Sequence, residues 1–117
     1  MDQKINEVGI ENCYVSEITL LEILYGVENS DDLRKAKNRA SYNKFAHLFQ
    51  QNIIPIATCY EIYAKEKARL KKEGELIGEF DMLIGSTAAA MDCVLVTRNI
   101  KHFNRLKGLT IENWIDD

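Results

Sequence analysis

Three polar residues occupy positions from which they could do chemistry together: Glu22, Asp81 and Asn99. Glu22 lies near the start of an expected helix, Asp81 opens an alanine-rich helix, and Asn99 follows an apolar strand. Carboxylate and carbonyl oxygens are the hard ligands that Mg²⁺ and Mn²⁺ prefer. If these helix starts and strand ends share one edge of a sheet, the oxygens of the three side chains can converge on such an ion.

Structural roles compete with this interpretation. Thr19 and Glu22 have the spacing of a capping box, in which the threonine caps the helix and the glutamate reaches back to the cap N–H. Thr58 and Glu61 share that spacing, so it gives Glu22 no special status. Residue types and spacing alone therefore favour a structural role for Glu22 over a catalytic one.

The other polar candidates have equally simple explanations. Asp81 can complement the helix dipole from the first turn, and Asn99 can cap a short turn. His47 lies between two phenylalanines, where we expect partly buried packing. His102 lies near the proposed site but has no second histidine or cysteine at ligand spacing. The sequence has no glycine-rich phosphate loop, Ser–His–Asp order or zinc spacing.

The elements that would position these residues alternate between strand and helix. We expect strands at 12–16, 53–56, 93–97 and 109–114, and helices that begin near Thr19, Ser30, Thr58 and Asp81. Pro55 cannot donate to a strand ladder, so its strand should lie at a sheet edge. The continuous apolar run at 93–97 suits a strand buried on both faces. This alternation predicts an α/β fold with a parallel sheet, in which active sites gather at the carboxyl ends of the strands.

Composition limits the class of protein. The 117 residues are 46% hydrophobic, which suits one globular domain over 1–117, and no apolar stretch reaches membrane-spanning length. Three separated cysteines and a polar N-terminus without a signal peptide favour a cytoplasmic protein with buried, unpaired thiols. The net charge is −3, yet lysine and arginine gather at 34–44, 65–72 and 98–107. These runs are either solvated helix faces or flanks of an acidic site that hold phosphates.

Three segments, together with the ending Gly108–Trp114, resemble the PIN-domain family, specifically VapC-type toxins. Ser16–Gly26 is similar to the family's S-x-x-T-x-x-E-L-x-x-G segment, and Ile77–Ala88 to its I-G-x-x-D-x-x-I-A-A-T-A segment. Leu95–Phe103 is similar to L-V-T-x-N/D-x-x-x-F. Order and spacing agree over nearly the whole chain.

The resemblance implies a metal-dependent ribonuclease toxin of a type II toxin–antitoxin system, with a three-layer fold that has helices on both faces of a parallel sheet. It implies Mg²⁺ or Mn²⁺ as cofactor with Asp81 and Glu22 as metal ligands, RNA as substrate and an antitoxin protein as partner. By position, Glu22 and Asp81 correspond to the second and third acidic residues of the family's site, and Asn99 to the fourth. Thr97 and Arg98, just before Asn99, are expected to position the substrate.

The chain departs from the family at its start. The family opens with a strand that ends in L-L-D-T-N, whose aspartate is a principal metal ligand, and this sequence has no such segment. We therefore expect an N-terminally truncated PIN-like domain whose sheet lacks its central first strand, between 13–16 and 94–97. Those flanking strands should either pair directly or promote homo-oligomers. The alternative to an impaired nuclease is a non-catalytic module that binds an antitoxin or another copy of itself.

Overall fold

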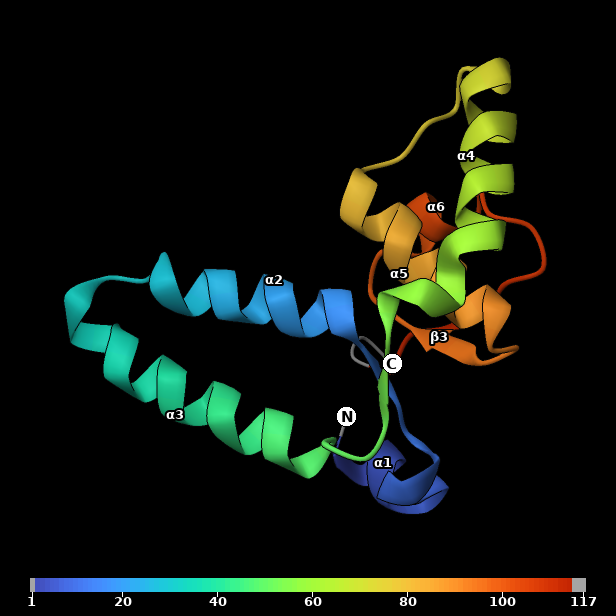
Figure 1. The fold of residues 1–117 in the computed structure, drawn as a ribbon. Helices are drawn as coiled ribbons and strands as arrows, with labels where there is room; N and C mark the ends of the chain where they lie inside the picture. Colours follow the sequence, from blue (N-terminus) through green and yellow to red (C-terminus); the bar gives the residue numbers. More distant parts are fainter. Residues whose placement is uncertain (1, 115–117) are drawn as a thin grey trace.

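The computed structural model describes residues 2–114 as an α/β arrangement of helices and short strands (Figure 1). The elements in chain order are α1 (Asp2–Val8), η1 (Ile10–Asn12), β1 (Val15–Ser16), α2 (Glu17–Glu28), α3 (Asp32–Leu48), β2 (Ile53–Ile54), η2 (Ile56–Cys59), α4 (Tyr60–Glu73), α5 (Glu79–Ala90), β3 (Val94–Val96), α6 (Ile100–Phe103) and β4 (Thr110–Glu112). Of these described helices, none is long and apolar enough to cross a membrane.

All described strands pair in parallel, which confirms the predicted α/β class. β1 pairs with β2, with Val15 opposite Ile53, and β3 pairs with β4, with Val94 opposite Thr110. These are two separate two-stranded sheets, and β1 does not pair with β3. Within residues 2–114, β1 and β3 therefore each keep one unpaired edge. Direct pairing of the two flanking strands, one of the two expected outcomes, is not observed.

Strand β3 is more exposed than the sequence predicts. Val94 is 45% exposed, so the prediction of a strand buried on both faces is wrong. The reason is that β3 has one strand neighbour instead of two. The β2 strand does lie at a sheet edge, as Pro55 predicted, and Pro55 follows it as the first residue before η2.

The main core joins α4, α5, α6 and the turn after α6. Its buried members are Leu70, Met82, Phe103 and Leu106. Gly85 on α5 permits this close packing, because a Cβ at that position would lie 3.1 Å from Phe103 Cδ1 and closer still to Leu106 Cδ1. Helix α5 thus packs directly against the segment that follows β3, and this contact brings α6 close to the start of α5.

Helices α2 and α3 form an antiparallel hairpin that extends away from this core (Figure 1). Ser16 caps α2, since its Oγ accepts a hydrogen bond from the Thr19 N–H at 3.0 Å. Asp31 caps α3 in the same way through the Arg34 N–H. Helix α3 has no fully buried residue, so it contributes a solvated surface on one side of the hairpin.

The observed caps correct the predicted capping boxes. Helix α2 begins three residues earlier than the Thr19–Glu22 box requires, so Glu22 lies inside the helix and does not cap it. The box at Thr58–Glu61 is also wrong, because a 3₁₀ turn precedes α4 and Cys59 stands at its N-cap without a side-chain cap. Gly74 ends α4 in the left-handed conformation, with φ of 69°.

Two burial predictions also need correction. His47 is exposed, because α3 presents it to solvent despite its two phenylalanine neighbours. The three cysteines are unpaired, as expected. However, only Cys59 is fully buried, whereas Cys13 and Cys93 are partly buried because each lies in a short connection next to a sheet.

Candidate active site

Asp81 lies in the first turn of α5. The helix begins after Gly78 and places Asp81 at its third position, where the negative charge complements the helix dipole. Its side chain is 28% exposed, so it is partly shielded and still reachable from solvent. The prediction that Asp81 opens this helix is correct to within two residues.

Glu22 on α2 is close enough to Asp81 to respond to its charge. Helix α2 contacts α5, and the Glu22 side chain is half-buried. Partial burial raises the pKa of the Glu22 carboxyl, and the negative charge of Asp81 raises that pKa further. The two carboxylates therefore form a pair with unfavourable mutual repulsion, which a cation between them would relieve.

His102 from α6 is the third group at this place. Its Nδ1 lies 3.3 Å from Asp81 Oδ2. This contact joins residues 21 positions apart, and the spacing of histidines and cysteines in the sequence had offered no partner for His102. Only the packing of α6 against α5 brings the two side chains together.

Asn99 and Thr97 organise the turn that leads to His102. The Asn99 N–H donates a hydrogen bond to Thr97 Oγ1 at 3.1 Å, and the Asn99 carbonyl accepts from the N–H groups of His102 and Phe103. The predicted cap at Asn99 is therefore made by its backbone, since its side chain makes no cap hydrogen bond. In the described part of the chain, the Asn99 side chain also makes no hydrogen bond with either carboxylate.

The carboxylate pair fits a loosely held cation better than a closed metal cage. Within residues 2–114, no three His, Cys, Asp or Glu side chains lie close enough together to hold a metal ion. Mg²⁺ is commonly bound by one or two carboxylates, with water and substrate phosphate as the remaining ligands. Glu22 and Asp81 match that donor set, whereas a tightly binding site would need a further carboxylate.

Comparison with known proteins identifies the class. The PIN-domain family model matches residues 2–109, so the chain belongs to the PIN-domain family. Within that family it is 39% identical over 101 residues to ribonuclease VapC2 of Rickettsia felis, covering 86% of this chain and 72% of that protein. It is 32% identical to the tRNA(fMet)-specific endonuclease VapC of Salmonella typhimurium, covering 86% of this chain and 74% of that protein. The predicted family is thereby confirmed.

Solved structures agree with this assignment. The VapBC2 structure from Rickettsia felis, bound to a promoter DNA fragment, superposes with a TM-score of 0.85 at 33% identity, covering 97% of this chain and 84% of that chain. The DNA-bound VapBC structure from Salmonella typhimurium superposes with a TM-score of 0.87 at 27% identity, covering 97% and 83%. The fold is therefore that of the PIN domains in these structures.

Proposed function

We propose that this chain is a divalent-metal-dependent ribonuclease, the toxin of a type II toxin–antitoxin pair, and that it hydrolyses RNA phosphodiester bonds at Glu22 and Asp81. The observation that carries the proposal is the packing of α2 against α5 in a chain of the PIN family, which brings the Glu22 carboxyl within electrostatic reach of Asp81. Its relatives are named ribonucleases and endonucleases, and PIN-domain ribonucleases generally depend on divalent metals.

Each residue then has a defined task. Asp81 and Glu22 would hold Mg²⁺ or Mn²⁺. A divalent cation bound there supplies charge neutralisation at the phosphate and makes water a better nucleophile. His102 contacts one oxygen of Asp81 and so orients that carboxylate. Arg98 holds a backbone phosphate, and Thr97 orders the turn that carries Arg98 through its hydrogen bond with Asn99.

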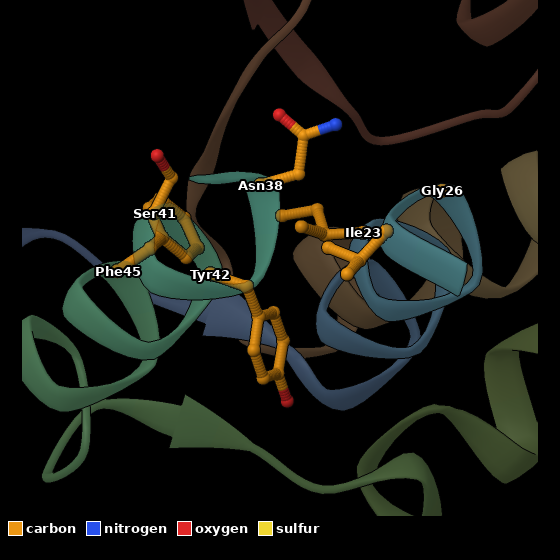
Figure 2. A pocket seen from close by; sticks show the side chains of 7 residues that line it. Ile23, Gly26, Asn38, Ser41, Tyr42 and Phe45 are labelled. Atoms are coloured by element: carbon orange, nitrogen blue, oxygen red, sulfur yellow. The ribbon is translucent and has the colours of Figure 1, made fainter. Parts of the chain in front are cut away.

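The protein partner that we propose is an antitoxin, and the α2–α3 hairpin offers a surface for it. A groove of about 350 Å³ lies between the two helices; it is lined by Ile23, Gly26, Val27, Asn38, Ser41, Tyr42 and Phe45. Figure 2 shows the side chains of Ile23 and Tyr42 between the helices. The similar VapBC structures contain toxin and antitoxin together, which supports an apolar antitoxin segment as the occupant. A cytoplasmic location stays a prediction.

RNA cleavage in the presence of Mg²⁺ or Mn²⁺ tests the proposal. The chain should cleave RNA slowly, EDTA should stop the reaction, and Asp81→Asn should abolish it. Glu61→Gln is the matched control, because Glu61 is an exposed acid in the first turn of another helix. If the chain binds an antitoxin and never cleaves RNA with either metal, the ribonuclease proposal fails and the non-catalytic module replaces it.

A further inference from the structure

A small open cavity lies beside Asp81, and the chemistry proposed above uses only part of its lining. It measures about 380 Å³ and is lined by Arg98, Asn99, Ile100, Lys101 and His102. One wall is the His102 side chain, whose Nδ1 lies 3.3 Å from Asp81 Oδ2. The cavity therefore opens directly beside the group that we assign to catalysis.

The cavity has a chemical character of its own in a chain whose net charge is −3. Arg98 and Lys101 are cationic, and the His102 ring and the Asn99 amide can donate hydrogen bonds. Several basic side chains of α3 and α4 are paired with acids, such as Arg39 with Glu28 and Lys67 with Glu79. By contrast, Lys101 makes no ion pair with any other described residue and is exposed.

An apolar surface lies next to this charge. Ile100 is 36% exposed and lines the same cavity. A nucleotide joins a phosphate, through a sugar, to a flat and partly apolar base, and this cavity offers a cation for the phosphate and a hydrocarbon surface for the base. Its volume is at the lower end of the roughly 300–1,000 Å³ of small-molecule sites, which suits one nucleotide rather than two.

We infer that this cavity is a nucleotide subsite that binds the RNA residue next to the scissile phosphate, with Lys101 on the phosphate and Ile100 against the base. The inference rests on the ribonuclease function proposed above and extends it. A basic subsite at this place would also offset an electrostatic repulsion. Glu22 and Asp81 repel an approaching phosphate, and cations beside them offset that repulsion over a few ångströms.

Binding measured without metal tests the subsite apart from catalysis. Adenosine monophosphate, adenosine and inorganic phosphate would each be titrated, in EDTA, into the wild-type chain and three variants: Lys101→Ala, Ile100→Ala and Lys37→Ala. Lys37 is an exposed lysine on α3, so it is the matched control for loss of one positive charge. Melting temperatures of all variants establish that each is folded.

The wild-type chain should bind the nucleotide more tightly than it binds either adenosine or phosphate. Lys101→Ala should weaken nucleotide binding about tenfold, a typical effect of losing one charge-assisted contact, and Lys37→Ala should leave it unchanged. Ile100→Ala should weaken the nucleotide and adenosine while phosphate is unaffected. Equal binding by the two lysine variants, or phosphate bound as tightly as the nucleotide, would overturn the subsite.

A second readout separates this inference from the proposed function. With Mg²⁺ and an RNA substrate, Lys101→Ala should raise KM and leave kcat near the wild-type value, because the subsite binds and does not react. An unchanged KM alongside normal cleavage would reject the subsite alone. Absence of metal-dependent cleavage by the wild-type chain would reject the ribonuclease proposal, whatever the nucleotide titrations show.

Discussion

Replacing Gly85 by alanine should destabilise the fold, although alanine is ordinarily the better residue for a helix. Gly85 lies four residues after Asp81 on α5 and packs against Phe103 and Leu106, which are 3% and 5% exposed. A Cβ there would lie 3.1 Å from Phe103 Cδ1 and overlap Leu106 Cδ1. Since Phe103 directly follows His102, any outward shift of this segment also moves His102 away from Asp81.

The expected size follows from two opposing effects. Alanine in place of glycine inside a helix stabilises by about 0.5–1 kcal/mol. Forcing extra volume into a well-packed core costs about 1–3 kcal/mol. Gly85→Ala should therefore leave the free energy of unfolding between unchanged and about 2.5 kcal/mol lower. At about 4 °C per kcal/mol for a chain of this size, the melting temperature should fall by up to about 10 °C.

Gly26→Ala is the matched control, because it is the same substitution in another helix. A Cβ at Gly26 would have no atom within 4 Å, so the helix gain should appear alone. Its melting temperature should rise by about 2–4 °C. Thermal unfolding followed by circular dichroism measures both variants. If Gly85→Ala proves as stable as Gly26→Ala, the tight contact between α5 and the segment after α6 is wrong.

The Glu22 carboxyl, the α2–α3 groove and the unpaired strand edges each give a further prediction. Burial and the charge of Asp81 raise the pKa of Glu22, so the free energy of unfolding should rise as the pH falls from that raised pKa towards the ordinary carboxyl pKa. The Glu22→Gln variant should lack this rise. Urea unfolding measured across this pH range tests the prediction, and the same pH dependence in both proteins would contradict it. Gly26→Gln should fill the α2–α3 groove and weaken antitoxin binding in a pull-down or titration while RNA cleavage is retained; full antitoxin affinity would exclude this groove. The unpaired edges of β1 and β3 should promote association of copies, so light scattering should give a mass that increases with concentration, whereas a constant monomer mass would refute it.

Local sequence patterns predicted the elements better than their caps. The α/β alternation, the parallel pairing and the helix start near Asp81 are all confirmed. The first cap was misassigned because Ser16 and Thr19 are both hydroxyl residues, each followed after three positions by a plausible partner. The end of the preceding strand decides which of the two residues caps the helix, and β1 ends at Ser16.

The contacts that build the site depend on tertiary structure. His102 and Asp81 meet only because α6 packs on α5, and no spacing rule in the sequence encodes that contact. His47 shows the converse case: its phenylalanine neighbours suggested burial, yet α3 packs mainly against α2 and leaves His47 exposed. Which face of a helix is covered depends on neighbours that a local pattern does not specify.

The claim that Glu22 and Asp81 together form a metal site can be tested by Mn²⁺ binding, measured by electron paramagnetic resonance or calorimetry. The chain should bind Mn²⁺ weakly. Asp81→Asn and Glu22→Gln should each lower the affinity at least about tenfold, since even residues that only support metal ligands cost that much, whereas Glu61→Gln should change nothing. Undiminished Mn²⁺ affinity in Asp81→Asn would contradict the assignment of the site and, with it, the mechanism built on it.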